Sequence, residues 1–195
     1  NILNFKIKEI IDEPSEVIFV SSESLDGTEK SNRSIQTNLG AIITQSMAWS
    51  FNDEVDAALV NGGSIRVDDM LPINLSSLDI FRTLPFGGGI LKVDLKGVLL
   101  KEVLDYGTSK KGTGAYLQRH FIDQGPDGKW LIKGEEIILD KIYKVAFSDF
   151  LLRGFDIPFL TPNNKHVKNI YRPTKEENAY DIRKATILYL KSLGN

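Results

Sequence analysis

Hydrophobic positions along the chain follow two different spacings, one typical of strands and one typical of helices. From Thr37 onward, apolar residues recur every three or four positions, which predicts a helix that begins near Thr37 or Asn38 and carries Leu39, Ile42, Ile43 and Met47 on its inner face. Short runs rich in β-branched and aliphatic residues predict strands over residues 17–20, 57–60, 90–95, 116–122 and 142–147.

Local capping and turn signals predict where further helices and a hairpin lie. Ser76 with Asp79 resembles a capping box that opens a short helix. Residues 98–106 have an apolar face and end at Gly107, a typical helix terminator. Thr174 with Glu177 predicts the cap of a last helix over residues 175–193, and Asp127-Gly128 predicts a hairpin turn. Residues 1–12 fit either an amphipathic helix or an edge strand.

The order of these elements predicts a mixed architecture. Strands and helices alternate without a strict βαβ pattern, which indicates an α/β or α+β domain with mixed sheets. A chain of 195 residues is long enough for one substantial core, and no repeat or linker divides it. We therefore expect a single domain over residues 1–195. Because apolar residues follow directly after Asn1, we expect it to be an excised domain.

Charge and composition exclude several kinds of partner. The net charge of −2 and the pI near 5.8 provide no basic surface for nucleic acid. The apolar runs are too short to predict a membrane span. The sequence has no cysteine, which excludes disulfides, thiolate metal sites and cysteine nucleophiles.

The sequence has only two histidines, and this limits the catalysis that the chain could perform. His120 and His166 stand apart from any metal-binding spacing, and we expect them to be structural or solvated. A di-metal phosphoesterase centre requires several histidines and aspartates around two ions. No nucleophile elbow or phosphate-binding P-loop occurs either. We therefore predict neither a catalytic residue nor a metal or cofactor ligand in this chain.

Three glycine-rich segments carry the chemistry that remains, at residues 61–66, 84–89 and 148–156. Glycine permits close approach of the backbone to a ligand, phenylalanine offers a flat apolar surface, and arginine offers a planar set of donors. Taken singly, each of these side chains has an ordinary structural explanation. Their combination predicts a pocket for a ligand that is flat at one end and polar at the other, such as a nucleoside.

The same segments resemble the C-terminal domain of the 5′-nucleotidase family, which includes UDP-sugar hydrolases and 2′,3′-cyclic nucleotide phosphodiesterases. Residues 33–40 are similar to the family's arginine followed by T-N-L-G, and residues 61–66 to its N-G-G-G-I-R. Residues 84–87 match its L-P-F-G, and residues 114–118 resemble its G-x-F-L-Q strand. The resemblance extends from Val17 to the last helix and implies a four-layer α/β/β/α domain.

The resemblance also implies the roles of six residues. Family members hold the base between two phenylalanines, which correspond to Phe86 and Phe150. By the same correspondence, Asn61 lies at the base edge, and Asp156 accepts hydrogen bonds from the ribose hydroxyls. The arginines that meet ribose and phosphate oxygens correspond to Arg33 and Arg66.

One loop departs from the family pattern. The usual sequence N-F-L-A-x-G-G-D-G corresponds to residues 149–157, where Phe155 and Ile157 replace glycines. Each lost glycine reduces backbone freedom, so we expect the loop around Asp156 to be reshaped.

In the family, hydrolysis takes place in a separate N-terminal metallophosphoesterase domain that holds two divalent metal ions. That domain is absent from this chain, so we expect the chain alone to be inactive and to serve as the substrate-binding part of a nucleotide hydrolase. Its expected partners are a nucleotide or nucleoside and the metallophosphoesterase domain of the same parent chain. The resemblance further implies a periplasmic or extracellular location. Two alternatives stay open: a nucleoside-binding or scaffold module without a hydrolytic partner, and a relative with a changed substrate.

Overall fold

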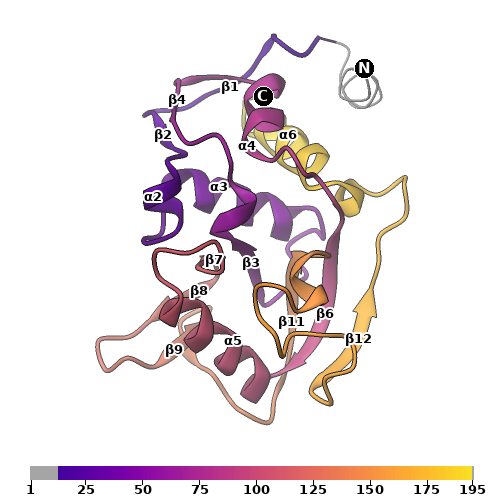
Figure 1. Ribbon diagram of the computed structural model, residues 1–195. Helices are drawn as coiled ribbons and strands as arrows, with labels where there is room; N and C mark the ends of the chain where they lie inside the picture. Colours follow the sequence, from indigo (N-terminus) through magenta and orange to yellow (C-terminus); the bar gives the residue numbers. More distant parts are fainter. Residues whose placement is uncertain (1–12, 195) are drawn as a thin grey trace.

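A five-stranded mixed sheet forms the centre of the computed structural model, which describes residues 13–194 (Figure 1). The strand order is β12-β6-β11-β3-β7, and only β11 and β3 run parallel. These strands are β3 (Ala57–Asn61), β6 (Ile90–Lys96), β7 (Leu117–His120), β11 (Ile142–Ser148) and β12 (Val167–Tyr171). The expected α/β class with mixed sheets is confirmed, whereas the element expected within residues 1–12 lies outside the described residues.

The remaining strands form smaller antiparallel sheets. β1 (Val17–Val20) pairs with β5 (Asn74–Ser76), and β2 (Leu25–Asp26) pairs with β4 (Met70–Leu71). A three-stranded sheet contains β8 (Ile122–Gln124), β9 (Trp130–Ile132) and β10 (Glu135–Glu136). The β8–β9 pair contains the expected hairpin turn, with Gly128 at a φ of +79°.

Helices cover both faces of the central sheet (Figure 1). One face packs against α3 (Asn38–Trp49), α4 (Ser77–Thr83) and α6 (Ile182–Leu193), and the opposite face packs against α5 (Gly97–Ser109). Short helical turns complete the fold at α2 (Glu29–Asn32), η1 (Gly62–Ser64), η2 (Leu151–Arg153) and η3 (Asn178–Tyr180).

The central strands are apolar on both faces because each face has its own core. In β3, Ala58 and Val60 belong to the core beneath α3 and α6, whereas Ala57 and Leu59 belong to the core beneath α5. All five residues of β3 are buried. A continuous apolar run is the pattern expected of a strand that is covered on both sides.

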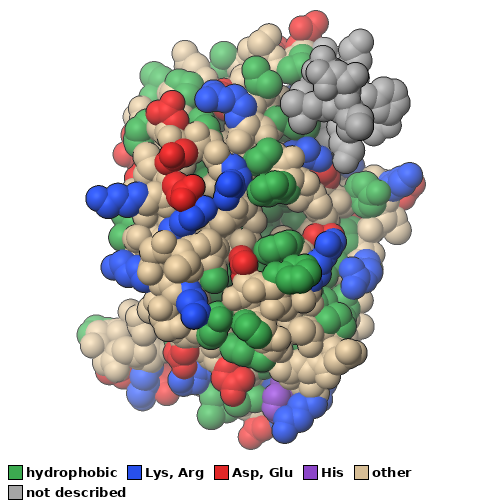
Figure 2. All heavy atoms as spheres, viewed as in Figure 1, with side chains coloured by type: hydrophobic (Ala, Val, Ile, Leu, Met, Phe, Trp, Pro, Cys, Tyr) green, Lys and Arg blue, Asp and Glu red, His purple; other side chains and the backbone are tan. Residues whose placement is uncertain are grey.

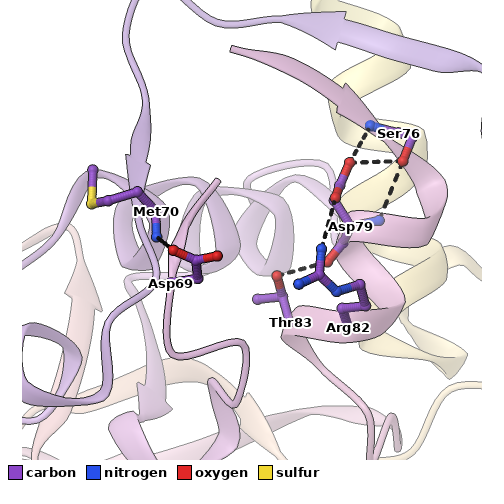
Figure 3. A network of polar contacts seen from close by, with 6 residues as sticks. All are labelled: Asp69, Met70, Ser76, Asp79, Arg82 and Thr83. Atoms are coloured by element: carbon purple, nitrogen blue, oxygen red, sulfur yellow. Dashed lines mark hydrogen bonds and ion pairs between the residues drawn. The ribbon is translucent and has the colours of Figure 1, made fainter. Parts of the chain in front are cut away.

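Two predicted helix starts are confirmed in detail. The Thr37 side chain accepts a hydrogen bond from the Gly40 N–H at 2.9 Å and caps α3. Figure 3 shows the capping box of α4, in which the Asp79 carboxylate accepts from the Ser76 N–H at 2.9 Å. Both caps join residues three positions apart, which is why short-range sequence patterns predict them.

Two predicted boundaries are wrong because tertiary packing overrides the local signal. Gly107 does not end α5, which continues to Ser109; Gly107 is instead buried where α5 lies against Leu117 of β7. The single strand predicted over residues 116–122 is interrupted at Phe121, whose φ of +62° separates β7 from β8.

The segment before the last helix also differs from the prediction. α6 begins at Ile182 rather than at residue 175, and its N-cap is Asp181, which accepts from the Arg183 N–H. The Thr174 N–H does bond to the Glu177 carboxylate, at 2.7 Å, but this contact closes a turn rather than a helix. The edge strand β12 was not predicted.

Candidate functional site

The candidate site lies where the two parallel strands of the central sheet end. Asn61 is the last residue of β3 and Ser148 the last residue of β11, and Leu59 pairs with Phe147 in the ladder. Because parallel neighbours end at the same edge of a sheet, the loops after both strands lie side by side. This geometry brings residues 61–66 and 148–156 together.

The third glycine-rich segment reaches the same edge from the opposite chain direction. β6 runs antiparallel to β11, so its first residue, Ile90, pairs with Ser148. The Asp149 N–H donates to the Gly89 carbonyl at 2.9 Å, which ties the two loops together. Gly87 and Gly88 have φ values of +58° and +100°, a left-handed conformation that strongly favours glycine.

A cavity of about 530 Å³ opens between these loops. Its wall includes all six residues that the sequence singled out: Arg33, Asn61, Arg66, Phe86, Phe150 and Asp156. Figure 2 shows hydrophobic side chains around a hollow near the middle of one face, with Lys and Arg side chains close by. The structure thus places the six residues at one site, and their individual roles in binding stay predictions.

The two phenylalanines of the cavity are unusually accessible. Phe86 is 72% exposed and Phe150 is 37% exposed, although large apolar side chains are usually buried. The Arg66 guanidinium lies over the Phe86 ring, with its Cζ 5.9 Å from the ring centroid. Phe155 lies beside Phe150 at a centroid distance of 5.9 Å. The Phe86 and Phe150 rings thus offer flat apolar surfaces to a ligand in the cavity.

A short hydrogen-bond relay holds the acidic group of the site. Asn61 Nδ2 donates to Asp156 Oδ2 at 2.7 Å, and Ser64 Oγ donates to Asn61 Oδ1 at 2.6 Å. Asn61 is only 2% exposed, so its amide is fixed by both neighbours and by packing. Asn61 therefore orients the Asp156 carboxylate, a function that its predicted place at the base edge did not include.

The loop around Asp156 accommodates the two residues that replace glycines of the family pattern. Gly154 keeps a left-handed φ of +76°, whereas Phe155 is exposed and Ile157 is fully buried. Asp156 nevertheless lies on the cavity wall, held by Asn61. The replacements change the surroundings of the loop without removing its carboxylate from the site.

Arg33 adds positive charge to the cavity wall. It follows α2 directly, and its Nη1 lies 2.7 Å from the Glu29 carboxylate. Its Nε is buried without a hydrogen-bond partner among the described residues. An unpaired donor of this kind is costly, so the guanidinium has hydrogen-bonding capacity beyond its contact with Glu29.

Several residues of the wall were not predicted. Asp149 and Arg153 flank Phe150, with Arg153 Nη2 3.7 Å from Asp149 Oδ2, and Ser64 completes the relay to Asp156. Gly63 and Gly114 meet backbone to backbone, since a Cβ on Gly63 would lie 3.1 Å from the Gly114 Cα. Two charges on either side of an aromatic residue, directly after a buried strand, were the available signal for Asp149 and Arg153.

No metal centre accompanies this cavity in the part of the chain that the structure describes. Within residues 13–194, no three His, Cys, Asp or Glu side chains gather as a metal site would require. His120 lies in β7 with its ring 3.8 Å from that of Phe121, and burial lowers the pKa of His120. No helix in the same range is long and apolar enough to cross a membrane.

Comparison with known proteins finds relatives of this chain. Residues 17–161 match the family model described as 5′-nucleotidase, C-terminal domain. The 5′-nucleotidase of Bos taurus is 30% identical, over 68% of this chain and 28% of its own length. The trifunctional nucleotide phosphoesterase protein YfkN of Bacillus subtilis is 28% identical, over 76% of this chain and 11% of its own length.

Solved structures extend the similarity over nearly the whole chain. A 5′-nucleotidase precursor from Thermus thermophilus superposes with a TM-score of 0.78 and 25% identity, over 98% of this chain and 39% of that one. NAD nucleotidase of Haemophilus influenzae, at 22% identity and a TM-score of 0.66, shares the fold. The chain spans well under half the length of each of these proteins. The family model covers most of the chain, and the chain therefore belongs to the family of 5′-nucleotidase C-terminal domains.

Proposed function

We propose that this chain forms a single substrate-recognition domain of a 5′-nucleotidase-type phosphohydrolase and that it binds nucleotides. The observation that carries the proposal is the cavity of about 530 Å³, whose wall combines exposed aromatic rings, three arginines and an oriented carboxylate. Such a wall is complementary to a base, a phosphate and a ribose in the same molecule.

Each part of a nucleotide has a suitable partner in the cavity. Phe86 and Phe150 would stack on the base, and stacking contributes about 1–3 kcal/mol per base with little dependence on its identity. The Asp156 carboxylate would accept hydrogen bonds from ribose hydroxyls, which are stronger than neutral ones because the acceptor is charged. Arg33 and Arg66 would bind phosphate or ribose oxygens through their planar donors.

Hydrolysis, in this proposal, is performed by an N-terminal metallophosphoesterase domain of the same parent chain. Two divalent ions in that domain would activate water for attack on phosphorus. The described residues contain no comparable grouping of ligands. We therefore propose that the chain alone releases no phosphate. From the family resemblance we also propose that the whole protein acts in nucleotide catabolism outside the cytoplasm.

Ligand-observed NMR titration with AMP, UMP and adenosine tests the binding role. We expect weak binding by the unaltered chain, and a Kd raised about 5- to 150-fold in Phe86→Ala or Phe150→Ala, which corresponds to the loss of stacking. Ile138→Ala is the matched control, because Ile138 is a large, exposed apolar side chain that does not line the cavity.

Two results would contradict the proposal. One is the absence of any binding at millimolar ligand; the other is an affinity that neither cavity phenylalanine affects. Phosphate release from AMP with added divalent metal, measured on the chain alone, would contradict the proposed division of labour between the two domains.

A further inference from the structure

A carboxylate lies between the two loops that carry the cavity phenylalanines. Asp149 immediately precedes Phe150, and its N–H donates to the Gly89 carbonyl at 2.9 Å. Asp149 lines the main cavity and also a second cavity of about 400 Å³, and the two cavities share Phe86, Gly88 and Asp149 as walls. The carboxylate therefore lies on the wall that the two cavities share, beside the loop that carries Phe86.

The position of this carboxylate is well defined by the glycine loop. A Cβ on Gly88 would lie 3.1 Å from Asp149 Oδ1, so the carboxylate lies directly against the Gly88 Cα. Gly88 is two residues after Phe86 and has a φ of +100°. One carboxylate is thus adjacent in sequence to one aromatic ring and adjacent in space to the loop of the other.

The acceptor capacity of Asp149 is largely unused. Its ion-pair partner, Arg153 Nη2, is 3.7 Å away, beyond hydrogen-bond distance, and the Arg153 side chain is 60% exposed. Exposed pairs of this kind contribute little. The Asp149 side chain is 32% exposed, so a ligand in the cavity can reach its oxygens.

We propose that Asp149 determines base preference, by accepting hydrogen bonds from N–H groups on the edge of the stacked base; this inference rests on the proposed function. An ionised carboxylate is an acceptor only. Cytosine presents a 4-amino donor, and guanine presents an N1–H and a 2-amino group together, which a carboxylate can accept as a pair. Uracil presents carbonyl oxygens on both sides of N3–H, and these oxygens repel a carboxylate.

The preference is measured by titrating the chain with two matched pairs of nucleosides. Cytidine and uridine differ at position 4 of the same ring, and guanosine and inosine differ only by the 2-amino group. We expect cytidine to bind on the order of tenfold more tightly than uridine, and guanosine more tightly than inosine by a similar factor.

Asp149→Asn is the decisive variant, because an amide of the same shape both donates and accepts. We expect it to reduce the cytidine-to-uridine ratio to near one, mainly by raising the affinity for uridine. The hydrogen bond from the Asp149 N–H to the Gly89 carbonyl does not involve the side chain, so the variant retains this link between the two loops. Asp140→Asn, at an exposed carboxylate that pairs with Lys96 and lines neither cavity, should retain the wild-type ratio.

The outcomes separate this inference from the function on which it rests. Equal affinities of the unaltered chain for cytidine and uridine would overturn the role of Asp149, and so would an Asp149→Asn variant that keeps the wild-type ratio. In either case, sensitivity of binding to Phe150→Ala would leave the proposed function standing. If no nucleoside binds at all, the proposed function fails together with the inference.

Discussion

Removing the charge of Asp181 should destabilise the domain strongly, because this aspartate is the partner of a buried arginine. Asp181 holds Arg183 through two contacts, Nε to Oδ1 at 2.9 Å and Nη2 to Oδ2 at 2.5 Å. The Arg183 side chain is only 5% exposed, and its Cζ lies 4.9 Å from the centroid of the Phe81 ring. Asp181 is also the N-cap of α6.

The expected magnitude follows from separating these two roles. A buried charge that loses its partner costs about 3–5 kcal/mol, and a lost N-cap costs about 1 kcal/mol. Asp181→Asn keeps a capping oxygen and one acceptor for Arg183, so we expect a loss of about 3 kcal/mol, at the lower end of that range. Asp181→Ala removes the cap as well and should lose more. For a chain of this size, about 2–4 °C per kcal/mol converts these losses into a Tm decrease of about 6–12 °C for Asp181→Asn and about 8–24 °C for Asp181→Ala.

The same substitution should weaken ligand binding, because the pair supports the loop that presents Phe86. The Arg183 guanidinium packs directly against Gly87, and the Ile182 N–H donates to the Gly88 carbonyl at 2.9 Å. A guanidinium without its carboxylate would move toward solvent and displace this loop. We therefore expect the Asp181 variants to bind adenosine less tightly than the unaltered chain even well below their Tm.

Urea unfolding followed by circular dichroism measures the change in the free energy of unfolding. The double variant Asp181→Asn/Arg183→Met is the control, since removal of both charges leaves no buried charge uncompensated and should recover most of the loss. If Asp181→Asn alone stays within about 0.5 kcal/mol of the unaltered chain, as typical surface substitutions do, the reasoning is refuted.

Two further substitutions test packing and titration. Gly107→Ala should lower the free energy of unfolding by about 1–3 kcal/mol, because the new Cβ would lie 2.8 Å from Leu117 Cγ. This loss should outweigh the better helix propensity of alanine. A gain in stability to urea would contradict this and would show that Leu117 can move aside. Burial, aided by Lys133 and opposed by Asp53, holds the pKa of His120 below its ordinary value of 6.5. The folded state therefore binds this proton less readily than the unfolded state, and the stability present above pH 6.5 is lost as the pH falls through the folded pKa. Urea titrations between about pH 7.5 and 5 should show a smaller decline for His120→Gln, and identical slopes would contradict this.

The parts of the fold that depend on neighbours in sequence were predictable. The Thr37 cap, the Ser76 capping box and the buried run of β3 each follow from a short pattern, and each is present. β12 was not predicted, because Val167–Tyr171 alternates poorly and is mostly exposed, and the strand forms by pairing with β6. The start of α6 was placed too early, since Thr174 and Glu177 satisfy a capping pattern that in this chain closes a turn.

In the candidate site, too, the sequence indicated the residues but not the contacts between them. Residue types and motif resemblance singled out six positions, and the fold places all of them on one cavity wall. The hydrogen bond between Asn61 and Asp156 joins residues 95 positions apart, so no local pattern could indicate it. Asp149 was not among these six, because its contact with Gly88 joins loops that lie far apart in the sequence.

The register of the parallel pair β3 and β11 fixes the relative position of the two loops that form the binding site. A slip of one residue would translate one loop against the other by about 3.3 Å, more than the whole 2.7 Å contact between Asn61 and Asp156. It would also turn Phe147 out of the core beneath α5. Core residues that do not contact the ligand therefore set the relative position of the two binding loops. A core substitution that allows the register of β3 and β11 to shift should reduce ligand selectivity before it unfolds the domain.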